Sequence, residues 1–155
     1  MNRKRLLLIL LAVLVLIQFI RIDRSIPETD PKQDFAYAAR PPAEVLTLIR
    51  DACYDCHSYE TKYPWYSQVA PVSWWLKGHI NEGREHFNFS TLGILDPHDL
   101  DGALESAAEV VREGEMPLRS YTWAHPEARL SDEQRALLAY WLDHFEPVSS
   151  SYGVK

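Results

Sequence analysis

The sequence predicts an all-α fold, in which a small domain of about four helices follows an apolar N-terminal segment. Three observations indicate this class. Apolar residues recur at helical spacing in four separate stretches, three of these stretches open with residues typical of helix N-termini, and β-strand patterns are nearly absent. The chain has 155 residues, which is enough for one domain of roughly 100 residues with appendages.

The first 24 residues have the features of an export signal that is retained as a membrane anchor. Residues 3–5 are all basic and precede an apolar run over residues 6–20, in which Gln18 is the one polar side chain. No small-residue cleavage site follows, so we expect an uncleaved signal anchor. Fifteen helical residues rise about 22 Å against a hydrocarbon core of about 30 Å, and extending the span to Ile22 closes part of the gap. The basic start places the N-terminus in the cytoplasm.

Residues 25–42 are predicted to form a Pro-rich, extended tether. Four prolines stand there among Asp, Glu, Lys and Gln, with few large apolar residues to bury. The helical domain is then expected over residues 43–147, and a flexible tail over residues 148–155.

The first two helices of the domain are predicted on either side of an aromatic loop. One begins at Pro42, and its apolar residues recur at helical spacing up to Cys53. A loop rich in aromatic residues follows over residues 59–71. The second helix is expected over residues 73–86, with Leu76 on its apolar face.

The third and fourth helices have stronger terminal signals. The third opens at Asp96, an N-cap residue followed by a proline, and Gly114 is a plausible stop. The fourth opens with a capping box at residues 131–134 and carries an apolar stripe to Phe145, after which Pro147 ends it.

The run from Cys53 to His57 has the pattern C-x-x-C-H, which is typical of covalent haem attachment. The two thiols stand three residues apart, so both can add to the vinyl groups of one porphyrin, and His57 then ligates the iron. The chain holds no other cysteine. We predict one haem c, with Cys53 and Cys56 as its thioether attachments and His57 as the proximal ligand. Bacteria attach such haem at the outer face of the inner membrane, so we expect a periplasmic haem domain.

Two other interpretations of the cysteine pair stay open. A disulfide or a redox-active dithiol is possible outside the cytosol, although the thioredoxin-like form needs a βαβ context that the sequence does not show. A structural zinc site usually needs four protein ligands, and here one or two further histidines would have to complete it.

Two residues are candidates for the distal iron ligand. Met116, the one methionine besides the initiator, follows a helix stop and precedes a proline, where small monohaem cytochromes supply a thioether. His125 lies in a later loop and is the alternative distal ligand. A methionine that fills a core gap is the competing interpretation for Met116.

Three further side chains are candidates for contact with the porphyrin. Trp65 and Tyr66 belong to a dense aromatic set and are expected to pack on it, although ordinary core packing explains such residues equally well. Arg84 is predicted to approach a haem propionate.

The charge of the chain excludes one class of partner. The net charge is −6, from 22 acidic and 16 basic residues, and no basic patch exists to neutralise phosphates. Nucleic-acid binding is therefore not expected. The expected partners are the membrane, through the N-terminal helix, and a redox protein that the sequence does not identify.

With these residues assembled, the chain resembles a family of small, membrane-tethered haem-binding domains with a c-type haem motif. The resemblance covers about residues 43–146 and implies a single covalent haem in a fold similar to monohaem cytochrome c. Leu118 stands where the family often has a second proline. The resemblance rests on six blocks that occur in order: 53–58, 63–67, 70–74, 81–90, 114–117 and 125–131.

Electron transfer is the function that these features favour, with His57 and Met116 saturating the iron and no substrate pocket required. The alternative is a haem-based sensor or a peroxidase-like enzyme, in which the sixth position is open or displaceable. The two differ in whether Met116 binds iron in both redox states.

Overall fold

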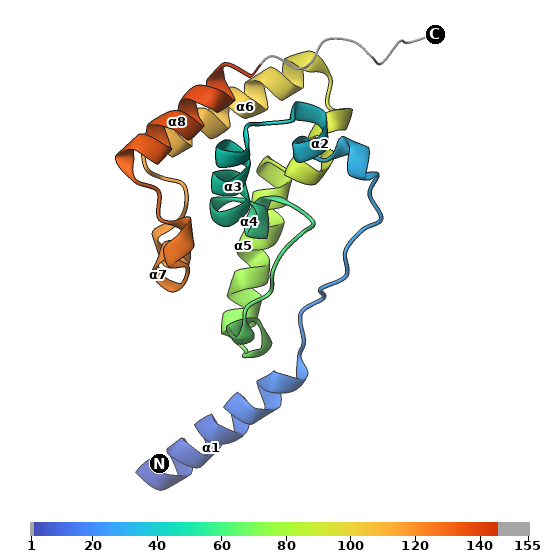
Figure 1. Ribbon diagram of the computed structural model, residues 1–155. Coiled ribbons are helices and arrows are strands. Elements are labelled where there is room, and N and C mark those ends of the chain that lie inside the picture. The colour runs from blue at the N-terminus through green and yellow to red at the C-terminus, as the bar shows by residue number, and fades with distance from the viewer. Residues whose placement is uncertain (1, 146–155) are drawn as a thin grey trace.

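The structure is a computed structural model that describes residues 2–145, and these residues contain helices and no β-strand (Figure 1). The all-α prediction is confirmed. The α-helices are α1 (Arg3–Leu16), α2 (Phe35–Ala39), α3 (Ala43–Ala52), α4 (Tyr54–His57), α5 (Val72–His86), α6 (Pro97–Arg112), α7 (Arg119–Ala124) and α8 (Asp132–Asp143). Short 3₁₀ segments are η1 (Ile17–Phe19), η2 (Pro31–Gln33), η3 (Trp65–Gln68), η4 (Phe89–Ile94) and η5 (Pro126–Ala128). The predicted tail, residues 148–155, lies outside the described residues.

The residues predicted from the sequence to begin or end helices do so in the structure. The Asp96 side chain accepts a hydrogen bond from the backbone N–H of Asp99 at 3.0 Å and so caps α6. Gly114 follows α6 with a φ of +79°, a left-handed conformation that favours glycine at a helix end. Ser131 and Gln134 form both halves of the capping box of α8.

The helices form a packed upper part and a narrower lower part in the view of Figure 1. α6 and α8 run side by side and antiparallel, and α3 packs against α8. α5 begins on the side nearest α1 and runs up to this layer, and it packs against the short helix α4, while α7 stands to one side of it. α4 therefore lies in the middle of the molecule, between the upper layer and α5.

The hydrophobic core joins the upper layer to the segment that precedes α3. Phe35 of α2 is 1% exposed and makes edge contacts with the rings of Phe89 and Trp141, at centroid distances of 5.2 and 5.4 Å. The buried members of this cluster are Phe35, Ala39, Val45, Ile49, Tyr54, Phe89, Leu92, Leu104, Ala108, Val111, Leu138, Ala139 and Leu142.

The segment predicted to be an extended tether, residues 25–42, contributes to this core in its second half. Asp34 caps α2 through the backbone N–H of Ala36, at 2.9 Å, and the helix buries Phe35 and Ala39. The packed unit thus begins near η2 rather than at residue 43. The tether prediction rested on prolines and charged residues, and one aromatic side chain among them is enough to dock a short helix.

α1 projects away from the rest of the molecule and exposes its apolar side chains (Figure 1). Its sequence continues into η1. Within residues 2–145, no helix combines the length and the apolar character that a membrane crossing requires.

The role of α2 in the core can be tested with two substitutions on that helix. Phe35→Ala is expected to lower the free energy of unfolding by about 3–5 kcal/mol, because it leaves a cavity among buried rings. The matched control is Tyr37→Ala, which removes a ring that is 49% exposed and is expected to cost less than about 1 kcal/mol. Urea titration of the full chain in detergent measures both. Equal effects would show that α2 does not belong to the core.

Candidate haem-binding site

The C-x-x-C-H motif has a helical turn of its own. Cys53 has φ −126° and ψ −41°, which is not a helical conformation. It therefore separates α3 from α4 and serves as the N-cap of α4. Cys56 lies within α4, three residues later, and this spacing brings both thiols to one side of the turn. Both cysteines are partly exposed and neither forms a disulfide.

The surroundings of the two thiols keep them protonated near neutral pH. Burial raises the pKa of Cys53 to about 12, and burial together with the Asp55 carboxylate raises the pKa of Cys56 to about 11. A redox-active dithiol instead relies on a thiol with a lowered pKa. No group of three or more His, Cys, Asp or Glu side chains in the described part of the chain is arranged to hold a metal ion. The structure thus supports neither the dithiol nor the zinc interpretation.

His57 is oriented by the end of α5. Its Nδ1 lies 2.9 Å from the backbone carbonyl oxygen of Phe87, and a carbonyl can only accept a hydrogen bond. Nδ1 therefore carries the proton, which leaves the lone pair on Nε2 free to bind a metal. Burial lowers the pKa of His57 from its ordinary value and so favours the neutral ring that ligation requires.

Gly83 lets α5 approach the motif closely. A Cβ atom at this position would lie 3.1 Å from the carbonyl oxygen of Cys56 and 3.4 Å from Cε1 of His57. The missing side chain thus sets the distance between α5 and α4. The sequence alone did not show that Gly83 faces the motif.

The first middle residue of the motif points into the core. Tyr54 is 2% exposed, and its ring stacks on Phe89 at a centroid distance of 5.1 Å. Its hydroxyl donates a hydrogen bond of 3.0 Å to Oδ1 of Asp34, the residue that caps α2. The guanidinium of Arg50 lies 5.0 Å above the ring. One side of the motif is thereby fixed to the core and to α2.

The second middle residue ties the motif to α7. Asp55 accepts a hydrogen bond of 2.8 Å at Oδ2 from the hydroxyl of Tyr121, and another of 2.8 Å at Oδ1 from the backbone N–H of Lys62. The ring of Tyr121 stacks on His125 at 4.2 Å. Tyr121 was not among the predicted site residues. It lies 66 positions from Asp55, and no local pattern in the sequence points to their contact.

Arg84 binds the loop that follows the motif. Its Nε donates to the backbone oxygen of Ser58 at 2.8 Å, and Nη2 donates to Oγ1 of Thr61 at 2.9 Å. The guanidinium also lies 4.9 Å from the centre of the Tyr59 ring. These contacts hold the loop against α5, and the predicted contact with a propionate stays a prediction.

The aromatic candidates lie beside α7. Trp65 is exposed, while the hydroxyl of Tyr66 is 2.9 Å from Nε2 of His125. Nδ1 of His125 is 3.1 Å from the carboxylate of Glu127. Both ring nitrogens of His125 are thus engaged, and binding iron would require the histidine to give up at least the contact with Tyr66.

Met116 lies in the loop between α6 and α7, and its backbone is held on both sides. Its N–H donates to the carbonyl of Val110 at 3.1 Å, and its carbonyl accepts from Nη1 of Arg135 at 2.8 Å. The side chain is half-buried and packs against the same hydrophobic cluster as Cys53. The structure therefore places this thioether on a fixed loop, and its role as iron ligand stays a prediction.

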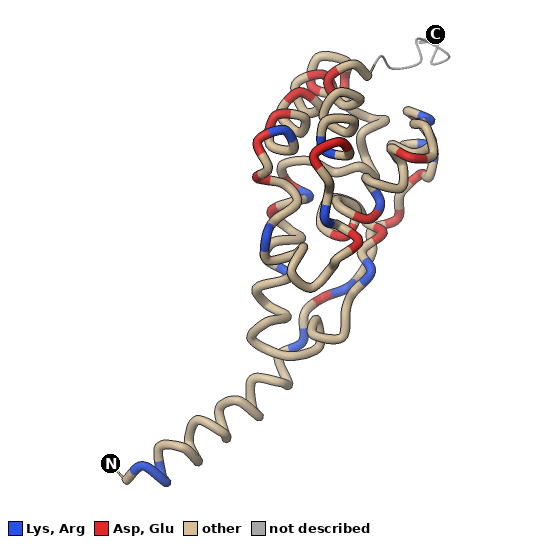
Figure 2. The backbone as a smooth tube through the Cα atoms, turned by 60° about the vertical axis from the view of Figure 1, so that its left-hand side comes forward, with Lys and Arg blue, Asp and Glu red and all other residues tan. Residues whose placement is uncertain are grey.

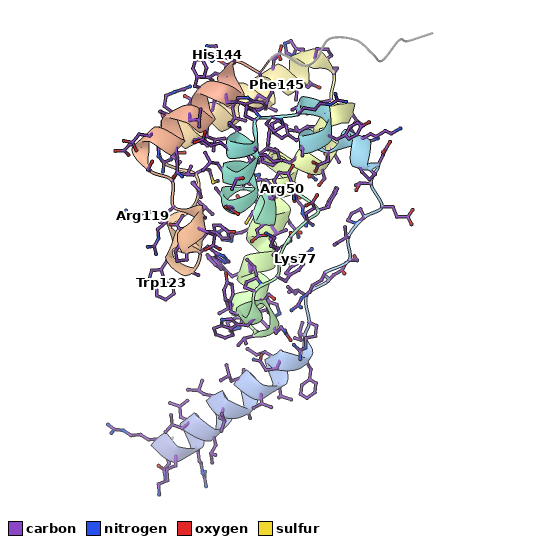
Figure 3. The ribbon with its side chains drawn as sticks, in the orientation of Figure 1. Arg50, Lys77, Arg119, Trp123, His144 and Phe145 are labelled. Carbon is purple, nitrogen blue, oxygen red and sulfur yellow. The ribbon has the colours of Figure 1, made fainter. Side chains whose placement is uncertain are left out.

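A cavity of about 570 Å³ lies elsewhere, between α6 and the end of α8. Its lining includes Leu104, Leu142 and acidic side chains, together with His144 and Phe145, which Figure 3 marks beside the end of α8. None of the motif residues lines it.

The fold and site define a class: an all-α domain built around a C-x-x-C-H turn whose histidine presents a free nitrogen. Comparison with known families agrees. The model of a family described as the haem-binding domain matches residues 12–144, and the chain belongs to this family. Comparisons with curated proteins and with solved structures find no match.

The close approach at Gly83 leads to a paired test on one helix. Gly83→Ala is expected to lower the free energy of unfolding by about 1–3 kcal/mol, because the new Cβ overpacks against α4. Gly78→Ala is the control, since a Cβ there meets no atom within 4 Å. That substitution is expected to stabilise α5 by up to about 1 kcal/mol. Urea titration compares the two, and a Gly83→Ala chain as stable as Gly78→Ala would contradict the contact.

Proposed function

We propose that this chain is a membrane-tethered, periplasmic c-type cytochrome that binds one haem covalently and transfers electrons. Cys53 and Cys56 would hold the porphyrin, and His57 and Met116 would ligate the iron. The bound haem supplies an iron that cycles between Fe(II) and Fe(III). Membership of the haem-binding domain family supports the haem, and the site residues support the mode of binding.

The observation that carries this proposal is the state of His57 beside the two unpaired thiols. The hydrogen bond to the Phe87 carbonyl fixes which nitrogen is protonated and holds the ring in place. The same short turn presents both cysteines, free of disulfide, at the spacing that haem attachment needs. A fixed neutral imidazole next to two available thiols fits a covalent haem with a proximal histidine.

The loop position of Met116 supports its role as the distal ligand. Backbone hydrogen bonds on both sides of the residue restrict where the thioether can lie. A soft sulfur ligand favours ferrous iron, so a His/Met pair raises the reduction potential relative to two histidines. A saturated iron suits an electron carrier rather than an enzyme.

The proposed location rests on the N-terminal sequence and on the chemistry of attachment. Basic residues at positions 3–5 favour a cytoplasmic N-terminus, and haem attachment in bacteria takes place on the periplasmic side. The chain would thus be held at the inner membrane by its apolar N-terminal segment and would exchange electrons with a redox protein.

Covalent attachment can be tested by a haem stain after denaturing electrophoresis of the full chain, exported together with c-type maturation machinery. Haem is expected to stay on the denatured chain and to be lost with Cys53→Ala plus Cys56→Ala. Tyr37→Ala, an exposed substitution outside the motif, is the control and should retain the stain. A folded, exported chain without retained haem would overturn the proposal.

The distal ligand can be tested with Met116→Leu, which keeps a similar side-chain volume and removes the sulfur. The ferric haem is expected to become high-spin, and the reduction potential to fall by on the order of 0.1 V, within the range of about 0.8 V that axial ligands span. His125→Gln is the control and should leave the spectrum unchanged. A high-spin ferric haem in the unsubstituted protein would instead favour the sensor or peroxidase-like function.

A further inference from the structure

Three of the five tryptophans expose most or half of their side chains to solvent. Trp65 is 78% exposed, Trp75 is 51% exposed and Trp123 is 83% exposed, whereas Trp74 and Trp141 are half-buried. Indole rings are large and apolar, with one polar N–H, and exposed rings of this kind are common where a protein meets a lipid headgroup layer. We call these three residues, with the exposed Val69 and Val72, the tryptophan face.

The residues of this face lie at one end of the molecule. Trp65 is in η3, and Trp75 is in the first turn of α5, which η3 contacts. The hydrogen bond between Tyr66 and His125 joins η3 to the end of α7, which carries Trp123. Figure 1 shows η3, the start of α5 and α7 on the side nearest α1, and in Figure 3 Trp123 projects from α7 toward that side.

The end of the apolar N-terminal segment is fastened to this face. The side-chain amide of Gln18 forms two hydrogen bonds with the backbone of Ala70, donating to its oxygen at 3.0 Å and accepting from its N–H at 2.9 Å. The indole N–H of Trp74 donates to the backbone oxygen of Ile20 at 3.0 Å. These bonds explain why the one polar side chain in the apolar run is a glutamine.

Two arginines extend the attachment. Arg21 donates to the backbone oxygen of Gln68 at 3.1 Å, and Arg24 donates to that of Ser67 at 2.8 Å. The Arg24 guanidinium also lies 5.2 Å from the centre of the Tyr63 ring. Residues 18–24, which we call the clamp, therefore hold the loop before α5 against the exit of α1. The orientation of the domain relative to α1 is set by these contacts.

Several basic residues lie on the elements that form the tryptophan face and the clamp, which also contains Asp23. Basic side chains occur near the tryptophan face, with Arg21 and Arg24 in the clamp, Lys77 on α5 and Arg119 on α7 (Figure 3). Figure 2 shows several acidic residues at the opposite end, and others in the middle of the molecule and along the segment after α1. Those on α6 and α8 are Asp99, Asp101, Glu105, Glu109, Asp132, Glu133 and Asp143.

From these observations we propose that the tryptophan face lies on the surface of the lipid bilayer, so that the domain is docked on the membrane and not only tied to it. This inference rests on the membrane anchor of the proposed function. The three indoles would enter the headgroup layer, and the basic residues beside them would meet anionic lipid. The acidic end would point away from the negatively charged surface.

Docking would fix the position of the candidate haem site relative to the membrane. Tyr121 of α7 donates its hydroxyl hydrogen to Asp55 of the C-x-x-C-H motif, and Trp123 stands two residues further along the same helix. The Tyr121 side chain thus connects the motif to the helix that carries Trp123. A redox partner in the membrane would therefore find the site at a fixed distance from the bilayer surface.

The proposal can be tested on the full, haem-loaded chain, inserted as one copy per nanodisc and footprinted with hydroxyl radicals. One set of nanodiscs contains phosphatidylcholine with phosphatidylglycerol, and a second set contains phosphatidylcholine alone. Mass spectrometry then reports the oxidation rates of Trp65, Trp75 and Trp123. Tyr140 of α8, which is 62% exposed, serves as the reference within the same chain.

The three tryptophans are expected to be oxidised several-fold more slowly than in a clamp variant, Gln18→Ala plus Arg24→Ala, with the stronger protection in the anionic lipid. Tyr140 should react equally in both chains. Lys32→Ala, an exposed basic residue outside the clamp, is the control variant and should keep the protection.

Two outcomes would overturn docking while leaving the anchor intact. Tryptophans that react equally fast in the unsubstituted chain and in the clamp variant would show that the domain stands free of the lipid. Protection that appears only with two copies in a nanodisc would assign the face to a second copy of the chain. A chain that does not enter nanodiscs would instead overturn the anchor on which this inference rests, whereas the haem stain tests the cytochrome function separately.

Discussion

The close contact between α4 and α5 is the constraint on which the candidate site depends. Gly83 has no side chain to separate the two helices, and four residues later the carbonyl of Phe87 accepts the Nδ1 proton of His57. A side chain at position 83 would push away the turn that carries both cysteines. The histidine would then lose the bond that selects its tautomer. A metal ligand is useful only when its free nitrogen faces a defined direction, and here a glycine and a backbone carbonyl together define it.

The two middle residues of the motif extend this constraint to the rest of the domain. Tyr54 reaches into the core and, through Asp34, to the start of α2, whereas Asp55 reaches outward to Tyr121 on α7. The short turn is therefore held from three directions. This arrangement explains why a segment before the domain, α2, and a short helix after Met116, α7, both bear on the geometry at Cys53 and Cys56. It also means that a change far along the chain can displace the candidate site.

Local signals made the main helices predictable, and distant contacts left the rest unpredictable. The capping signals act on the ends of their own helices, so a few adjacent residues are enough to predict them. They are Asp96, Gly114 and the box at residues 131–134. The C-x-x-C-H pattern is equally local. By contrast, α2 depends on a single aromatic residue that fills a space made by α8 and η4, and the Tyr121 contact joins residues far apart in sequence. Such contacts leave no periodic pattern, because each involves one side chain at each end.

The two proposals, electron transfer and membrane docking, constrain each other. If lipid covers the tryptophan face, a soluble redox partner has access only to the other surfaces of the domain. One of these surfaces carries the acidic residues of α6 and α8, which would attract a basic protein over distances comparable to the Debye length (Figure 2). A partner within the membrane would instead approach along α7 and η3, next to the aromatic side chains that neighbour the motif. The side on which a redox partner binds therefore depends on which face of the domain the lipid leaves uncovered. The clamp at residues 18–24 would determine that face, because it sets the orientation of the domain relative to α1.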